Sequence, residues 1–145
     1  MICILGSDHA GVVLAKEILT LLKEHKKVSK VIDIIPKDNT KMDYPDYAKL
    51  VCKEVNSNEN TLGILICGSG IGMSICANKI DGIRAALCAN EYMAKYARAH
   101  NNANVLCLGE RVIGIGLAKD IVSIFLDTEF EGGRHQLRLN KINLL

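Results

Sequence analysis

Short apolar segments alternate with longer amphipathic segments along the chain, and this alternation constrains the fold more than any other feature. Leu62–Cys67 is apolar throughout apart from one glycine, as in a strand buried on both faces. Gly11–His25 instead repeats apolar residues at helical spacing. Five such alternations predict an α/β fold, a Rossmann-like or flavodoxin-like five-stranded parallel sheet with helices on both faces in a three-layer αβα arrangement.

The boundaries of the predicted elements follow from the apolar periodicity and from turn residues. The predicted strands are Met1–Gly6, Val31–Ile35, Leu62–Cys67, Ile83–Ala89 and Val105–Leu108. The predicted helices are Gly11–His25, Tyr44–Val55, Met73–Lys79, Glu91–His100 and Ile113–Leu126. Pro36–Asp43 reads as a polar loop and residues 131–145 as a polar, basic tail. We see no repeat or second domain, so we expect one domain over residues 1–145.

Composition excludes several classes of protein. A net charge of +2 is too small to indicate a nucleic-acid-binding protein, and 49% hydrophobic residues argue against general disorder. No apolar run approaches the roughly 18 residues of a membrane span, and no basic segment precedes the first apolar run. The 6 cysteines form no CxxC pair, so we expect free thiols in a reducing cytoplasm, without a disulfide framework or zinc site.

Polar motifs follow the first and the third predicted strands. The first strand ends in Gly6-Ser-Asp-His9 and the third in Cys67-Gly-Ser-Gly-Ile-Gly72. In a flavodoxin-like order these two strands flank the switch point, where ligands bind beyond the carboxyl ends of the strands. We therefore expect both motifs to face one crevice.

The glycine loop after the third strand can expose backbone N–H groups to an anion or oxyanion. Its residues are Gly68, Ser69, Gly70, Ile71 and Gly72. The alternative is a plain strand-to-helix turn. A dinucleotide site is disfavoured because the G-x-G-x-x-G pattern should follow the first strand, and here Met73 replaces the third glycine.

Individual side chains near the strand ends admit both a chemical and a structural interpretation. Cys67 lies beside the loop, where a nearby helix N-terminus favours a thiolate, although a strand-end cysteine can be purely structural. Asp8 and His9 could bind phosphate or shuttle protons, or Asp8 could cap a helix. His100 and Asn101 end a helix, where a histidine can act as a general acid or simply favour the helix dipole.

Basic residues in the last third of the chain suit a phosphate group. Arg134 and Arg138 are four residues apart, so on a helix they share one face, and Arg111 follows the fifth strand. The alternative is a solvated basic surface.

Together these motifs resemble the type B ribose-5-phosphate isomerase family, which also contains allose-6-phosphate and galactose-6-phosphate isomerases. The matching segments keep their order over nearly the whole chain and are Ser7-Asp-His-Ala-Gly11, Asp43-Tyr-Pro45, Ile66-Cys-Gly-Ser-Gly-Ile-Gly72, Ala77-Asn-Lys79, Gly82-Ile-Arg-Ala85, His100-Asn101, Asn104-Val105, Gly109-x-Arg111 and Gly132-Gly-Arg-His-Gln-x-Arg138.

The resemblance implies a role for each matched residue. It implies that Cys67 is the base that moves a proton between carbons 1 and 2, and that His100 assists opening of the sugar ring. Some family members use a glutamate on the next helix instead, where this chain has Ser74 and Ile75. Substrate-binding positions are implied for Asp8, His9, Gly68, Ser69, Gly70, Ile71, Gly72 and Asn101, and phosphate-binding positions for Arg111, Arg134 and Arg138.

The resemblance also implies a homodimer with shared active sites, in which the tail at about 131–145 packs on the partner subunit, and no metal or organic cofactor. The expected reaction interconverts ribose 5-phosphate and ribulose 5-phosphate. Two alternatives stay open, a hexose-6-phosphate isomerase of the same family and a non-catalytic sugar-phosphate-binding module. No nucleic acid or membrane partner is expected.

Overall fold

The computed structural model describes residues 1–37 and 42–144, so four residues of the predicted loop Pro36–Asp43 and the last residue lie outside the described part of the chain. The strands are β1 Ile2–Ser7, β2 Lys30–Ile34, β3 Thr61–Cys67, β4 Ala85–Leu87 and β5 Val105–Gly109. The helices are α1 Val12–Glu24, α2 Tyr44–Ser57, α3 Ile71–Ala77, α4 Glu91–Ala99, α5 Ile115–Asp127 and α6 Arg134–Ile142, and the short 3-10 helix η1 His9–Gly11 precedes α1.

The strands form one parallel sheet in the order β2-β1-β3-β5-β4, which confirms the predicted sheet and places β1 beside β3. The last two strands are exchanged relative to a strictly consecutive order, because the chain runs to the sheet edge as β4 before it returns as β5. Every residue of β5 is buried, whereas β4 is half-buried. Strand β4, at one edge of the sheet, pairs only with β5, and it is shorter than the predicted strand Ile83–Ala89.

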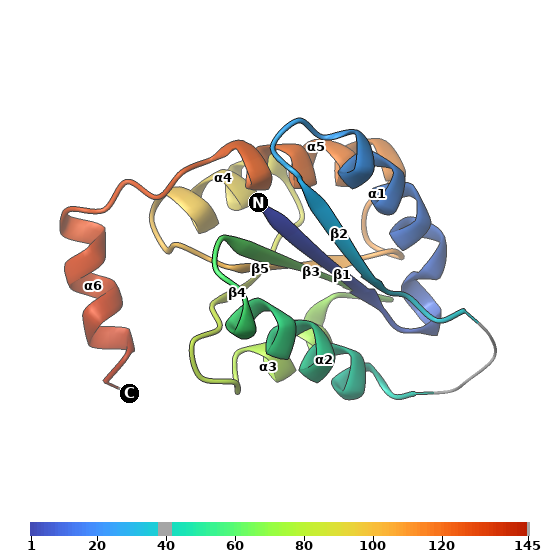
Figure 1. The fold of residues 1–145 in the computed structure, drawn as a ribbon, viewed down its shortest axis with the longest axis horizontal. Helices are drawn as coiled ribbons and strands as arrows, with labels where there is room; N and C mark the ends of the chain where they lie inside the picture. The colour runs from blue at the N-terminus through green and yellow to red at the C-terminus, as the bar shows by residue number, and fades with distance from the viewer. Residues whose placement is uncertain (38–41, 145) are drawn as a thin grey trace.

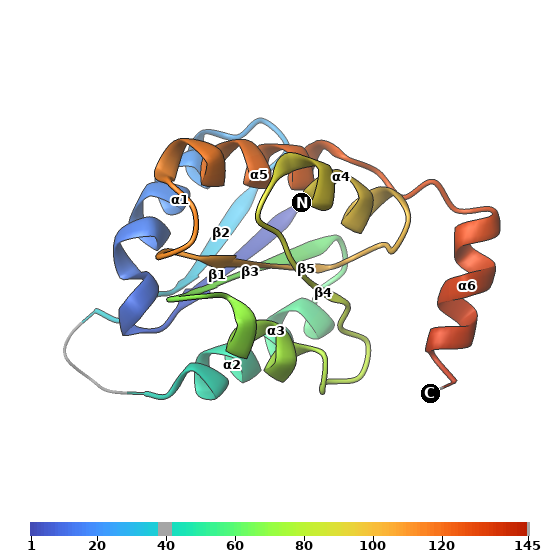
Figure 2. The ribbon, with the colours of Figure 1, turned by 180° about the vertical axis from the view of Figure 1, so that it is seen from behind.

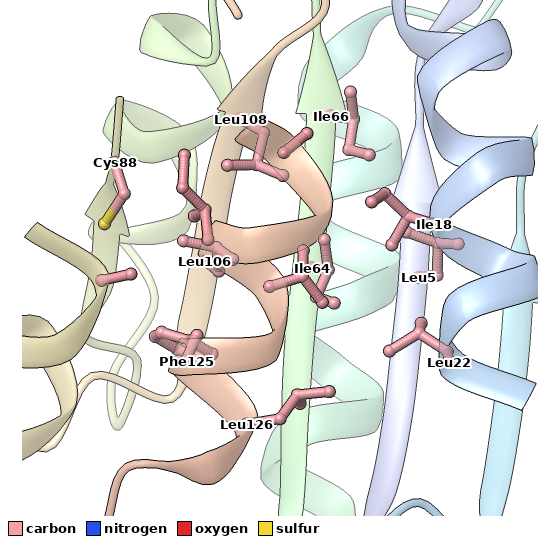
Figure 3. Packing of buried hydrophobic residues seen from close by; sticks show 14 of the residues in the cluster. Leu5, Ile18, Leu22, Ile64, Ile66, Cys88, Leu106, Leu108, Phe125 and Leu126 are labelled. Atoms are coloured by element: carbon pink, nitrogen blue, oxygen red, sulfur yellow. The ribbon is translucent and has the colours of Figure 1, made fainter. Parts of the chain in front are cut away.

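Helices cover both faces of the sheet, as predicted. Figures 1 and 2 show α2 and α3 on one face and α1, α4 and α5 on the other. Two apolar clusters fill the spaces between these layers. Figure 3 shows the larger one, in which α5 contributes Phe125 and Leu126 and the sheet contributes Ile64 and Leu106. Burial of each such side chain stabilises the fold by about 1.5–3 kcal/mol, so branched aliphatic residues can build this core without tryptophan.

The structure refines both motifs at the switch point. Helix α3 begins at Ile71, not at Met73, so the loop after β3 is only Gly68–Gly70. After β1, Asp8 is the N-cap of η1, and its side chain accepts a hydrogen bond from the Ala10 N–H at 2.9 Å. The capping interpretation of Asp8 is therefore confirmed.

The tail forms α6, a helix that stands apart from the layered body (Figures 1 and 2). Gly132 and Gly133 precede it with φ values of 66° and 53°, which side-chain-bearing residues rarely adopt. The sequence indicates only a polar, basic tail here, and α6 supplies the helix on which the spacing of Arg134 and Arg138 puts them on one face. None of the described helices is both long and apolar enough to cross a bilayer.

Candidate active site

The carboxyl ends of β1, β3 and β5 meet at one edge of the sheet. Ser7 is in register with Ile66, and Cys67 with Gly109. Just beyond β1, the Asp8 N–H donates to the Ile66 carbonyl at 3.2 Å. The two motifs that were expected to face one crevice therefore lie side by side at this edge of the sheet.

Cys67 ends β3 directly beneath the glycine loop. The side chain is buried, and its Sγ accepts a hydrogen bond from the Gly70 N–H at 3.1 Å. Gly70 has a φ of 77°, and this left-handed conformation turns its N–H back toward the sulfur. The loop therefore closes over the thiol and gives it a fixed donor.

Four of the other five cysteines lie in the apolar core, and all six thiols are free, as predicted. Burial raises the pKa of Cys3, Cys52 and Cys88 to about 11. Burial also raises the pKa of Cys107 well above its ordinary value. These thiols stay protonated at neutral pH, so they are core residues and not nucleophiles or bases.

The loop at Gly70 tolerates no side chain. A Cβ there would lie 2.6 Å from Leu87 Cδ1 and 2.9 Å from the backbone carbon of Leu108. We expect Gly70→Ala to lower the free energy of unfolding by about 2–4 kcal/mol, through left-handed strain and overpacking. Thermal unfolding measures this loss. The control is Gly116→Ala in α5, where a Cβ meets no atom within 4 Å and should be neutral or slightly stabilising. Equal melting temperatures for the two variants would contradict this account.

Two side chains close the loop from outside. The Arg111 Nη1 atom lies 3.4 Å from the position that a Cβ on Gly68 would take, so this guanidinium covers the loop. The ring of Tyr44 lies 2.7 Å from the position that a Cβ on Gly72 would take, so it packs directly against this glycine. Sequence reasoning missed Tyr44 as a wall of the site, although the Asp43-Tyr-Pro45 motif was its signal.

Glu110 is a second residue that sequence reasoning missed. Its N–H donates to the Cys67 carbonyl at 2.9 Å, and its Oε2 accepts the Leu14 N–H, in the first turn of α1, at 2.8 Å. Glu110 thus ties the end of β5 to the segment that follows Asp8 and His9. Only its place between Gly109 and Arg111 in the sequence could have drawn attention to it.

The predicted site residues fall into two groups in one chain. The carboxyl-edge group comprises Asp8, His9, Cys67, Gly68, Ser69, Gly70, Ile71, Gly72 and Arg111. The tail group comprises His100, Asn101, Arg134 and Arg138. Asp8 is buried and His9 exposed, whereas Asn101, Arg134 and Arg138 are all exposed.

The tail group lies at the opposite edge of the sheet from Cys67. Helix α4 starts beyond the carboxyl end of β4 and runs back, so His100, its C-cap, lies near the amino ends of the strands. The N–H of Gly63, the third residue of β3, donates to the Asn104 carbonyl at 2.8 Å. This hydrogen bond ties the turn after α4 to the start of β3. The seven residues of β3 span roughly 20 Å. One chain alone therefore does not bring His100 to Cys67.

His100 instead contacts the tail of its own chain. Its ring stacks on the His135 ring with centroids 4.0 Å apart and planes at 11°. The Glu131 Oε2 atom lies 3.6 Å from His100 Nε2 and 3.5 Å from His135 Nε2. Burial, followed by the positive charges of His100 and Arg134, lowers the pKa of His135.

These three side chains place their donor atoms within 4.8 Å of one another, close enough to raise the question of a metal. A metal must lie near the plane of each imidazole that binds it, along the nitrogen lone pair. Two nearly parallel rings stacked at 4.0 Å do not offer such a shared point.

A doubly wound sheet with a glycine loop closed over a thiol at its switch point defines an α/β protein suited to a small anionic ligand. A family model described as Ribose/Galactose Isomerase matches residues 3–142. The chain therefore belongs to this family and is an isomerase.

Relatives and solved structures resemble the chain over almost its full length. Ribose-5-phosphate isomerase B of Escherichia coli is 46% identical over 140 residues, which cover 97% of this chain and 93% of the relative. The structure of Clostridium thermocellum ribose-5-phosphate isomerase B gives a TM-score of 0.93 at 50% identity, covering 99% and 96% of the two chains. The Mycoplasma genitalium enzyme with bound ribulose 5-phosphate gives 0.92 at 45% identity, covering 99% and 94%.

Proposed function

We propose that this protein interconverts ribose 5-phosphate and ribulose 5-phosphate. The observation that carries the proposal is the hydrogen bond from the Gly70 N–H to Cys67 Sγ beneath the glycine loop, in a chain that belongs to an isomerase family. Relatives of similar length carry the name of this activity, and one was solved with the ketose phosphate bound.

Proton transfer between neighbouring carbons needs one base that reaches both. In the proposed reaction the Cys67 thiolate takes the proton from C2 of the open-chain aldose, and the electron pair passes through the C1–C2 bond to O1 as a cis-enediolate. The proton on O2 then moves to O1, and Cys67 returns its proton to C1. The N–H that Gly70 donates stabilises negative charge on the sulfur before the first transfer and after the last one. The loop and the first two residues of α3, together Gly68–Gly72, face the developing oxyanion.

The aldose must open its ring before this transfer. His100 donates a proton to the ring oxygen as the bond from that oxygen to C1 breaks, and the C1 hydroxyl loses its proton to water. His100 then regains a proton from water, so the cycle is closed. A donor of this kind contributes roughly 10²–10⁴-fold to the rate of the step.

Both groups of residues must meet at one substrate, so we infer that the site forms between two copies of the chain. Cys67, Asp8, His9 and the loop come from one subunit, and His100, Asn101, Arg134 and Arg138 from its partner. Arg111, over the loop, joins the tail arginines in binding the phosphate. Remote binding of this group positions the sugar and contributes to transition-state stabilisation.

Exposed apolar residues support this assembly. Tyr92 on α4 and Leu137 on α6 are 72% and 67% exposed, and Leu144 beyond α6 is 87% exposed. Large apolar side chains left exposed on α4, on α6 and just beyond α6 are typical of a surface that another subunit covers.

The experiment that tests the function is a coupled assay of the purified protein with ribose 5-phosphate and, in parallel, allose 6-phosphate, with EDTA present. We expect turnover of the pentose phosphate and much slower turnover of the hexose phosphate. A preference for the hexose would keep the mechanism and overturn the substrate. Binding of both without turnover would overturn the enzymatic proposal in favour of a binding module.

A further inference from the structure

Glu131 lies beside two stacked imidazole rings, with its Oε2 atom near Nε2 of both, and this arrangement is more ordered than a single substrate contact at His100 requires. Its backbone N–H donates to the Ala99 carbonyl at 3.0 Å, which fixes the tail against the end of α4. His135 is only 4% exposed, so its ring is held firmly beneath His100. The plane of the proposed acid is thus set by residues outside the carboxyl-edge group.

The stack disfavours two charged rings, because two imidazolium ions with centroids 4.0 Å apart would repel each other. Burial and the neighbouring cations lower the pKa of His135, which favours its neutral form. The Glu131 carboxylate, 3.6 Å from His100 Nε2, is then available to orient the His100 ring.

Other groups around the two rings have defined effects. Tyr96, one turn earlier on α4, packs on the His100 ring at 4.6 Å and carries no charge at neutral pH. The cations of Arg134 and Arg138 oppose protonation of the cluster, and a bound phosphate would offset them. Among the described residues, no hydrogen bond engages Nδ1 of His100.

We propose that His135 and Glu131 are positioning residues for His100. The His135 ring holds the His100 ring in its plane, and the Glu131 carboxylate, 3.6 Å from His100 Nε2, fixes the rotation of that ring. The inference rests on the proposed function, because it assigns the two residues to the ring-opening step and not to proton transfer between carbons.

The first test is the rate of Glu131→Gln in the two directions of the reaction, since this substitution keeps the shape of an exposed side chain and removes its charge. Turnover of ribose 5-phosphate should fall about threefold to tenfold, given the solvent exposure of Glu131. The ribulose 5-phosphate direction, which starts from an open chain, should keep its rate. Glu129→Gln, an exposed carboxylate two residues earlier, is the matched control.

The second test concerns the stack. We expect His135→Ala to slow the ribose 5-phosphate direction about tenfold or more, because a loosely held acid is misplaced. His135→Phe, which restores a flat ring, should recover part of this loss.

The outcomes separate this inference from the proposed function. A wild-type rate with ribose 5-phosphate in Glu131→Gln, or equal losses in both directions in either variant, would overturn the positioning roles while wild-type turnover upholds the function. Absence of wild-type turnover, or a His100→Asn variant that behaves as wild type, would instead overturn the proposed function on which the inference rests.

Discussion

Replacing Cys67 by alanine should reduce turnover in both directions by roughly a thousandfold or more, because the variant lacks the proposed base that carries the proton between the two carbons. In the proposed site the phosphate is bound by arginines that the substitution does not touch, so the affinity for substrate should change little. The loss should therefore appear in kcat and not in KM. Steady-state kinetics with both substrates, together with direct binding measurements, test this separation.

Two further variants keep the result interpretable. Cys67→Ser preserves the shape of the buried side chain and should be as inactive as Cys67→Ala, since a hydroxyl is far too weakly acidic to supply an anion at neutral pH. Cys76→Ala removes a half-buried thiol from the neighbouring helix α3 and should keep wild-type kinetics. Full turnover by Cys67→Ala would show that another group is the base.

Replacing His100 by asparagine should affect the two directions of the reaction unequally. Ribose 5-phosphate is a closed furanose that must open, whereas ribulose 5-phosphate cannot close such a ring because its C5 oxygen carries the phosphate. We expect the aldose-to-ketose rate to fall about 10²-fold or more and the initial ketose-to-aldose rate to change far less. Product aldehyde closes its ring in solution without the enzyme.

A kinetic signature accompanies this asymmetry. When the variant depends on ring opening in solution, the aldose rate should stop increasing as more enzyme is added, because the uncatalysed step limits it. His25→Asn, at the end of α1 and paired with Asp127 at 3.6 Å, is the matched control and should behave as wild type. Equal losses in both directions would assign His100 to the proton transfer or to binding instead.

Much of the fold could be predicted from local pattern. Continuous apolar runs such as Leu62–Cys67 identify buried parallel strands, and turn residues mark their ends, so the five strands were found. The exchange of β4 and β5 could not be predicted, because strand order depends on packing between distant segments. The start of α3 at Ile71 depends on the left-handed turn at Gly70, which the sequence permits but does not require.

The site was predictable in part for similar reasons. Cys67 and the glycine loop are adjacent in sequence, so their contact follows from one turn. The hydrogen bond from the Leu14 N–H to Glu110 joins residues that are 96 apart in the sequence, and no local sequence pattern predicts it. The separation of His100 from Cys67 could have been deduced, because a helix between parallel strands must run back and end at the opposite edge of the sheet.

The most direct test of the central claim, a site completed by two copies of the chain, is to dissociate and reassociate a mixture of Cys67→Ala and His100→Asn subunits and to measure turnover of ribose 5-phosphate. Each mixed dimer would hold one site with an intact Cys67 from one subunit and an intact His100 from the other. Statistical mixing makes half of the dimers mixed, so we predict about one quarter of wild-type activity from two nearly inactive proteins. A mixture no more active than its parents would contradict a shared site.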